Sequence, residues 1–206
     1  HYAICMEVGV DYLHSESIPE GKPEQPSGVR RFFWEALETI VISVVLFLAI
    51  NAVSERIRVE SISMEPNLYA GDFVLVNKLI YFIKKLPERG DVLVFRYPLN
   101  PDTTPYIKRV IGLPGDEVMI EGGKVYVNGE MLAEPYLDQG TTRGGTWNVP
   151  ENQLFVMGDN RANSSDSRAW GFVPMENVIG RAELIYWPPQ DWAMLHGNAA
   201  LAAPTP

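Results

Sequence analysis

An uncharged, strongly apolar stretch near the N-terminus constrains this chain more than any other feature. No charged residue occurs in 39–54, and 40–50 is almost continuous Ile, Val, Leu and Phe. The stretch is about 16 residues long, slightly short of the roughly 17–25 residues with which a helix spans a bilayer. Trp34 and its apolar neighbours extend the stretch into that range, and Trp34 suits the aromatic belt at the interface. The sequence therefore predicts one transmembrane helix at 31–54.

Two other interpretations fit this stretch less well. A buried core helix is usually amphipathic, whereas this segment is apolar on every side. A cleaved secretory signal starts close to the N-terminus, whereas the apolar run begins about 39 residues in, although 52–54 (Ala-Val-Ser) could pass for a cleavage site. Arg30 and Arg31 precede the span and favour a cytoplasmic N-terminus. Arg56 and Arg58 flank its far end, so charge alone orients the span weakly.

The segments on either side of the span differ from it in character. Residues 1–30 are mostly polar and contain several Pro and Gly, which predicts a flexible tail. Residues 189–206, rich in Pro and Ala, predict a disordered C-terminal tail. Between span and tail, 55–188 shows apolar residues at every second position, interrupted by Gly-containing turns, as in short β-strands. We expect strands at 73–77, 91–96, 106–111, 117–120, 124–128 and 153–157, and one short helix at 79–85. This domain is therefore predicted to be mainly β, a folded-over sheet or small barrel.

Composition removes several classes of function. A net charge of −9 and a pI near 4.8 argue against general nucleic-acid binding, which needs a basic face. The single cysteine, Cys5, allows neither an internal disulfide nor a cysteine-based metal site. His1, His14 and His196 lie in the end segments, so the β-domain (55–187) contains neither histidine nor cysteine. Ser-His-Asp and Cys-His catalysis are thereby removed, and no metal site is expected.

A hydrolase built from this domain needs another base, and lysine is the remaining candidate. An amine activates a serine when burial keeps the amine neutral near the working pH. Strand alternation puts both Lys108 and Lys78 among apolar neighbours on one face of a strand. The other lysines of the domain, Lys84, Lys85 and Lys124, lie near turns. Either strand lysine could equally be a surface residue whose stem covers apolar area, and alternation alone does not choose between the two.

Two further segments are candidates for chemistry. The run 61–66 (Ser-Ile-Ser-Met-Glu-Pro) ends in a proline bend that could present one of its serines to a substrate, although most such pairs only cap loops. The run 158–168 is polar and lies between two apolar segments, and its many hydrogen-bonding side chains suit a loop braced around a site. Asp159 and Asp166 raise a calcium-binding alternative, but their spacing does not match the calcium-loop pattern.

Taken together and in this order behind a membrane span, these segments resemble the type I signal peptidases, membrane proteases that use a serine and a lysine. The similarity extends over about 31–188. The run 61–68 resembles the nucleophile box of that family. The resemblance implies Ser63 as the nucleophile, with Ser61 as a side-chain donor to the oxyanion beside the Ser63 backbone N–H.

Two more boxes of the family have counterparts in this chain. The run 106–109 (Tyr-Ile-Lys-Arg) resembles the lysine box, which implies Lys108 as the general base and leaves Lys78 structural. The run 158–168 resembles the last box, where the resemblance implies that Ser164 hydrogen-bonds and orients Lys108.

The remaining implied roles concern bracing of the site. The resemblance implies that Asp166 and Arg168 pair within the last box, and 89–92 resembles a further, structural box. Asn67 stands where the family commonly has threonine, and Ala162 stands where it commonly has aspartate. Neither departure removes an implied catalytic group, so both concern local bracing.

The resemblance implies a coiled β-sheet catalytic domain of the signal-peptidase type behind one N-terminal transmembrane helix. The implied activity is that of a membrane-bound serine endopeptidase that removes N-terminal signal peptides from exported preproteins after small residues. Its expected partners are those signal peptides and the lipid bilayer, with no cofactor and no metal. Met64 and Ile107 are the candidate lining of shallow substrate pockets, and a substrate strand is expected along 58–60. We expect a single-pass protein of the cell membrane with its catalytic domain on the extracytoplasmic side.

Two other readings of the same residues stay open at this point. A self-cleaving regulator could use the same serine and lysine, but the membrane span and the lack of a preceding DNA-binding helix pair argue against it. A non-catalytic membrane-anchored β-domain could bind a partner protein. The presence of both Ser63 and Lys108 argues against that reading, and a preprotein cleavage assay separates the three.

Overall fold

The structure is a computed structural model that describes residues 28–82, 86–137, 140–141, 143–195 and 200–201. The flexible tail predicted at 1–30 lies outside the described residues except for its last three, which are helical.

Helix α1 (Gly28–Val53) is the long apolar helix expected from the uncharged stretch. Its 26 residues extend about 39 Å at 1.5 Å per residue, enough for a bilayer core of about 30 Å. The structure describes this helix in full, and none of its residues is buried. The hydroxyl groups of Thr39 and Ser43 each donate to the backbone carbonyl four residues earlier, which satisfies them without water. By length and composition, α1 is able to cross a membrane once.

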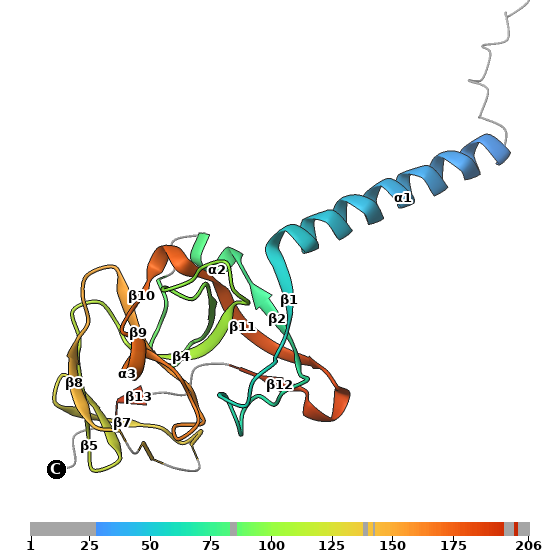
Figure 1. Cartoon of the computed structure of the whole chain (residues 1–206). Helices are drawn as coiled ribbons and strands as arrows, with labels where there is room; N and C mark the ends of the chain where they lie inside the picture. The colour runs from blue at the N-terminus through green and yellow to red at the C-terminus, as the bar shows by residue number, and fades with distance from the viewer. Residues whose placement is uncertain (1–27, 83–85, 138–139, 142, 196–199, 202–206) are drawn as a thin grey trace, which may run out of the picture. The chain divides into compact units, whose positions relative to one another are not determined.

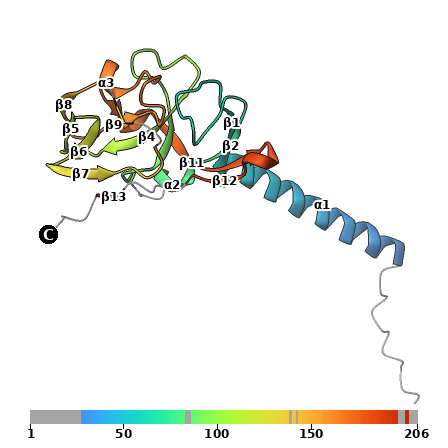
Figure 2. The same cartoon turned by 90° about the horizontal axis from the view of Figure 1, so that it is seen from below.

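The residues after α1 form a β-domain of two sheets (Figures 1 and 2). The larger sheet has eight strands in the order β1-β2-β11-β3-β4-β9-β10, with β12 paired to β11, and the smaller has five in the order β13-β7-β6-β5-β8. The strands are β1 (Ser54–Arg58), β2 (Phe73–Asn77), β3 (Val92–Phe95), β4 (Tyr106–Gly112), β5 (Glu117–Glu121), β6 (Lys124–Val127), β7 (Glu130–Ala133), β8 (Gly145–Asn148), β9 (Gln153–Met157), β10 (Val173–Pro174), β11 (Val178–Trp187), β12 (Ala193–Met194) and β13 (Ala200–Leu201).

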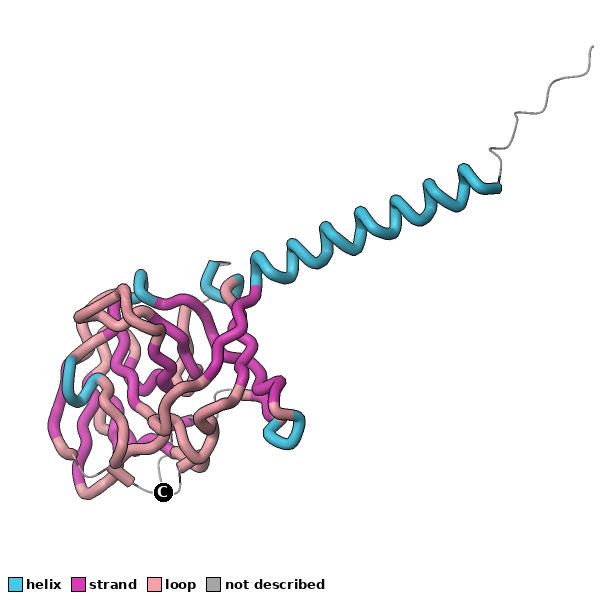
Figure 3. The backbone as a smooth tube through the Cα atoms, turned by 45° about the vertical axis from the view of Figure 1, so that its right-hand side comes forward, coloured by secondary structure: helices cyan, strands magenta, loops and turns pink. Residues whose placement is uncertain are grey.

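Helical segments in this domain are short, and strands and loops dominate it (Figure 3). They are α2 (Leu79–Phe82), α3 (Ser167–Trp170), η1 (Met175–Asn177) and η2 (Pro189–Asp191). The prediction of a mainly β chain with a curled sheet and one N-terminal apolar helix is confirmed.

All six strands expected from alternation are present, each within one residue of its predicted ends. The helix expected at 79–85 is present as α2, and its last three residues lie outside the described part of the chain. Alternation missed β11, although it is the longest described strand and pairs with both β2 and β3. The reason is that its pairing with β2 shifts register twice, between Ala182 and Leu184 and between Ile185 and Trp187, so its buried positions do not alternate regularly.

Strand β4 carries Lys108 through the middle of the larger sheet, between β3 and β9. Lys108 pairs with Leu93 on β3, and Arg109 pairs with Met157 on β9. Leu93 and Met157 are both fully buried. Polar side chains on this strand are therefore held away from bulk solvent by the sheet itself.

Residues 189–195 do not form the disordered tail expected at 189–206. Segment η2 and strand β12 turn the chain back onto β11. The Trp192 indole N–H donates to the Tyr186 carbonyl at 2.6 Å, and Leu195 is buried in the core. The burial of Leu195, the Trp192 hydrogen bond and the pairing of β12 with β11 order these residues despite the Pro and Ala composition on which the expectation rested. Apart from β13, the rest of this segment lies outside the described residues.

Candidate active site

Ser63 lies in a turn between β1 and β2 that is fixed from two sides. Beneath the turn, Met64 and Leu68 are fully buried in the core of the larger sheet. Above it, the Asn160 backbone N–H donates to the Ser63 carbonyl, and the Asn160 side-chain amide donates to the Ile62 carbonyl, each at 3.1 Å. Packing and hydrogen bonds therefore set the position of the Ser63 hydroxyl.

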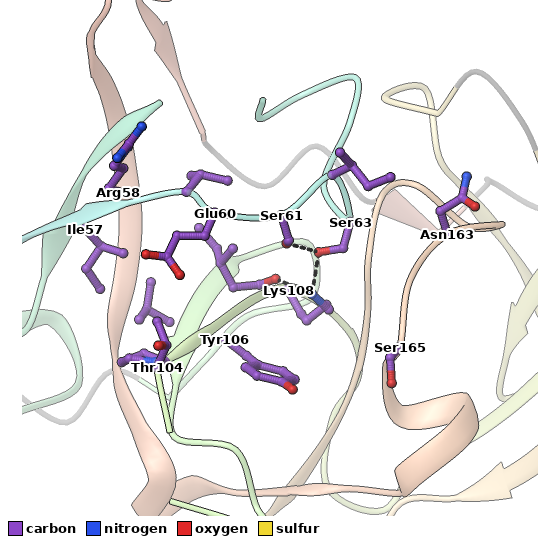
Figure 4. Close-up of a pocket in the computed structure, with 15 residues that line it drawn as sticks. Ile57, Arg58, Glu60, Ser61, Ser63, Thr104, Tyr106, Lys108, Asn163 and Ser165 are labelled. Carbon is purple, nitrogen blue, oxygen red and sulfur yellow. Dashed lines mark hydrogen bonds between the residues drawn. The ribbon is translucent and has the colours of Figure 1, made fainter. Parts of the chain in front are cut away.

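Lys108 reaches this hydroxyl from β4. Its Nζ lies 2.6 Å from Ser63 Oγ and 2.9 Å from the Ile107 carbonyl oxygen, and the residue is 4% exposed (Figure 4). Burial lowers the pKa of Lys108 from 10.5 to about 8, although the nearby carboxylates Asp166 and Asp159 oppose the shift. The amine therefore loses its proton far more readily than a surface lysine and can accept the proton of the adjacent hydroxyl.

Lys78, the other candidate base, lies in a different environment. It follows the last residue of β2, its side chain is 37% exposed, and its Nζ lies 3.7 Å from a carboxylate oxygen of Glu55 on β1. Alternation assigned similar strand neighbours to Lys78 and Lys108. Only the folded chain shows that the Ser63 turn meets one of the two lysines.

Ser61 adds a second hydroxyl beside the first. Ser61 Oγ lies 3.1 Å from Ser63 Oγ, and the side chains of Ser61, Ser63 and Lys108 converge in Figure 4. Within the described part of the chain, the Ser63 backbone N–H donates no hydrogen bond. A hydroxyl and a backbone N–H are thus both available near the place where an oxyanion would form.

Asp166 and Arg168 form a buried pair, in which Arg168 Nε and Nη2 donate to the two Asp166 oxygens at 2.7 Å each. Arg168 Nη1 also donates to the Thr141 hydroxyl and to the Arg161 carbonyl. Asp166 accepts the Gly158 N–H at 3.0 Å. Burial alone would raise the pKa of Asp166, but the bonds from Arg168 and Gly158 hold it below its ordinary value. Through these bonds to Gly158 and Arg161, the Asp166–Arg168 pair holds the two ends of the polar loop (158–168) together.

Ser164 does not contact Lys108 in the way the resemblance implies. Its buried Oγ makes no hydrogen bond of regular geometry with any described residue, and the Ile107 carbonyl takes the second contact of Lys108. Ser164 instead helps to lower the pKa of Asp166. Its side chain also packs so closely on Gly158 that a Cβ added there would overlap it.

A pocket of about 320 Å³ opens beside the Ser63 hydroxyl, and we name it the Ser63 pocket. Its walls are 57–63 on one side and 104–108 on the other, completed by Val94, Asn163 and Ser165 (Figure 4). Ser63 and Lys108 both line this pocket, so a molecule bound in it would lie beside both side chains.

Of the two candidate lining residues, the structure places only one in the Ser63 pocket. Ile107 lines it. Met64 does not, because its side chain is turned into the core and is 0% exposed. The neighbouring Ile62, 50% exposed, lines the pocket instead.

A second set of polar contacts ties the Ser63 turn to β4, and sequence reasoning missed it. Asp159 accepts from Arg109 at 2.8 and 2.6 Å and from the Asn67 side-chain amide at 2.9 Å. The same amide donates to the Tyr136 carbonyl at 2.9 Å, and the Arg109 guanidinium lies 4.0 Å from the Tyr136 ring centre. Asp159, considered above as a calcium ligand, forms an ion pair with Arg109 instead. Asn67, which replaces the threonine common in the family, connects Asp159 to the Tyr136 carbonyl. The sequence signal for this set of contacts was Arg109, a charged residue directly after Lys108 in a strand of otherwise apolar residues.

Comparisons with known proteins identify the family of this chain. The family model described as signal peptidase, peptidase S26, matches residues 33–187. Signal peptidase I of Leptolyngbya laminosa is 40% identical over 192 residues, covering 85% of this chain and 94% of that protein. Signal peptidase I of Pseudomonas fluorescens is 39% identical over 201 residues, covering 72% of this chain and 70% of that protein. A crystal structure of a signal peptidase I from Enterococcus faecalis V583, 36% identical, covers 47% of this chain and 97% of its own, with a TM-score of 0.43.

The family model and the two relatives named signal peptidase I define the class of this protein, whose curled β-domain holds a serine and an amine in contact. The chain is a serine endopeptidase, a hydrolase of peptide bonds. Within that class, the chain belongs to the signal peptidase family, peptidase S26. The resemblance drawn from the sequence is therefore confirmed, and the apolar helix α1 is consistent with an enzyme anchored in a membrane.

Proposed function

We propose that this chain removes N-terminal signal peptides from exported preproteins, cutting after small residues, with Ser63 as nucleophile and Lys108 as general base. The observation that carries the proposal is the buried 2.6 Å contact between Lys108 Nζ and Ser63 Oγ. A serine is a weak nucleophile at neutral pH unless an adjacent base takes its proton. Lys108, whose pKa burial lowers to about 8, is such a base. The relatives named signal peptidase I support the class of substrate.

The proposed reaction has two halves. Neutral Lys108 takes the hydroxyl proton while Ser63 Oγ bonds to the scissile carbonyl carbon, and the negative charge that develops on the carbonyl oxygen is held by Ser61 Oγ and the Ser63 N–H. When the intermediate collapses, the carbon–nitrogen bond breaks and the leaving amine takes the proton from Lys108. Neutral Lys108 then deprotonates a water that attacks the acyl-enzyme, and Ser63 recovers its proton.

The sheet offers an edge for an extended substrate. Strand β1 lies at one end of the order of the larger sheet. Residues 58–60 run from β1 into the wall of the Ser63 pocket. A peptide that adds as a strand along 58–60 would bring its carbonyl groups to Ser63. At about 320 Å³ the pocket is at the small end of the usual range of about 300–1,000 Å³, which favours small side chains beside the cut.

We infer that helix α1 anchors the enzyme in the cell membrane with its N-terminus in the cytoplasm and the β-domain on the extracytoplasmic side. Arg30 and Arg31 at the start of the helix support this orientation, and Trp34 suits the interface. The anchor would confine enzyme and substrate to one plane, where the end of a signal peptide emerges from the bilayer.

Cleavage of a preprotein by purified full-length variants tests the two roles. Lys108→Ala and Ser63→Ala are expected to abolish cleavage, because each removes a partner of the proton transfer. Ser61→Ala is expected to lower the rate by about two to three orders of magnitude, the usual effect of losing one oxyanion donor. Lys78→Ala is the matched control and should retain nearly full activity.

Two outcomes would contradict the assignment. Activity in Lys108→Ala together with none in Lys78→Ala would transfer the role of base to the exposed lysine. Cleavage by Ser63→Ala would reject the nucleophile. A wild-type chain that cuts no preprotein would leave an anchored β-domain that binds its partner without catalysis.

A further inference from the structure

A second, polar pocket of about 270 Å³ adjoins the Ser63 turn, and we name it the Glu65 pocket. It is lined by Glu65, Pro66 and Tyr69, which follow the serine in the chain, and by residues 159–163 of the polar loop. The mechanism above uses none of the space in this pocket.

The Glu65 pocket continues the path of the Ser63 pocket. Residues 57–62, directly before the nucleophile, line the Ser63 pocket, whereas Glu65 and Pro66, directly after the same turn, line the Glu65 pocket. Asn163 belongs to the walls of both pockets, and it lies on the far side of Ser63 from Glu60 in Figure 4. A peptide whose residues before the cut lie along 58–60 therefore leads, beyond Ser63, toward the Glu65 pocket.

The shared wall is fixed to the nucleophile rather than loose. Asn163 donates from its backbone N–H and its side-chain amide to the Asn160 side-chain oxygen, at 3.3 and 3.2 Å. Asn160 in turn holds the carbonyl groups of Ile62 and Ser63. The Glu65 pocket thus keeps a defined position relative to the atom that attacks the substrate, as a specificity site requires.

The charges around the Glu65 pocket leave one carboxylate unbalanced. Asp159 is paired with Arg109 through two hydrogen bonds, and Arg161 is paired with Glu134. Glu65 is half-buried, and its carboxylate makes no hydrogen bond or ion pair with any described residue. The lining therefore carries one net negative charge, located two residues after the nucleophile and partly shielded from water.

We propose that the Glu65 pocket receives the substrate residues that follow the scissile bond, and that Glu65 favours a lysine or arginine side chain there over an acidic one. The inference rests on the proposed function, because it takes the cut to occur at Ser63. Opposite charge attracts a basic side chain, and a half-buried carboxylate repels an acidic one more strongly than an exposed carboxylate would.

Peptide cleavage by the full-length enzyme in detergent tests this preference. The peptides share one sequence before the cut and carry Lys, Gln or Glu in turn at the first, second and third positions after it. At low ionic strength the wild type is expected to cleave the Lys peptide about tenfold faster than the Glu peptide, as kcat/KM, at one or more of these positions. In Glu65→Gln the ratio should fall to about 1, and in Glu65→Lys it should invert.

Glu151→Gln is the matched control, since it removes the same charge from an exposed turn outside both pockets and should leave the wild-type ratio unchanged. The ratio compares two peptides on one enzyme preparation, so partial unfolding of a variant does not alter it. A wild-type ratio near 1 at all three positions, or an unchanged ratio in Glu65→Gln, would overturn the inference while leaving the proposed function intact. Failure of the wild type to cleave even the Gln peptides would instead overturn the proposed function and this inference with it.

Discussion

An ammonium group inside a protein loses the hydration that stabilises its charge, and Lys108 is in that position. The carboxylates of Asp159 and Asp166 pull its pKa upward, but each is already engaged in two hydrogen bonds by an arginine, Arg109 and Arg168 respectively. Each carboxylate is thus already paired, and its attraction for the Lys108 ammonium is smaller than the effect of burial. Desolvation therefore dominates, and the pKa moves down rather than up.

The pH dependence of cleavage should report this residue. Burial lowers the Lys108 pKa to about 8, so the neutral, catalytically competent form increases as the pH rises through 8. We expect kcat/KM for a preprotein to rise up to about tenfold per pH unit below 8 and to level off above it. Lys78→Gln should leave the midpoint unchanged. A midpoint near 10.5, the value for an unperturbed lysine, would contradict a desolvated base.

The same shift should appear in the stability of the protein. Because the folded pKa of Lys108 lies below the unfolded value of 10.5, the unfolded chain binds this proton more tightly. The resulting destabilisation is complete below about pH 8 and fades as the pH rises toward 10.5. Lys108→Met should therefore be inactive yet more stable at pH 7, by about 2–3 kcal/mol.

Thermal unfolding of the full-length chain in detergent measures this effect. The difference between Lys108→Met and wild type should shrink between pH 8 and pH 10.5. A variant less stable than wild type at pH 7 would show that the amine contributes more through its contacts than it costs through its burial.

At the scale of elements, the site depends on a close approach between the Ser63 turn and the loop that follows β9. Gly158, directly after β9, is where the two meet. A Cβ at this position would overlap the Ser63 carbonyl oxygen and the Ser164 side chain. Gly158 does not have a positive φ, so the reason for glycine here is lack of space for a side chain and not backbone conformation.

Gly158→Ala is therefore expected to push the Ser63 turn away from β4. A displacement of about 1 Å costs on the order of 100-fold in rate, and the overpacking costs about 1–3 kcal/mol of stability. The measurements are kcat on a preprotein and thermal unfolding, with Gly28→Ala as the control because no heavy atom lies within 4 Å of an added Cβ there. Full activity in Gly158→Ala would show that the turn tolerates movement relative to the lysine.

At the scale of the whole molecule, the sequence predicts well what depends on local pattern. The apolar helix follows from an uninterrupted uncharged run, and the six strands follow from alternation, because every second residue of a strand faces the same environment. Strand β11 was not predicted, because its bulges break the alternation of buried residues. The burial of the Met64 side chain in the core was not predicted either. The bridge from Asn67 to Asp159 joins segments 92 residues apart and is set by tertiary packing, which single-sequence pattern does not encode.

The amine and the hydroxyl that meet at 2.6 Å come from segments 45 residues apart in the chain. Ser63 belongs to a turn before β2, and Lys108 belongs to β4. The two side chains meet only after the sheet has formed. A nascent or unfolded chain carries only an ordinary alcohol and an ordinary protonated lysine. Until the sheet has closed, the chain therefore lacks the proposed serine–lysine pair, and proteolytic activity is expected to appear only with the folded domain.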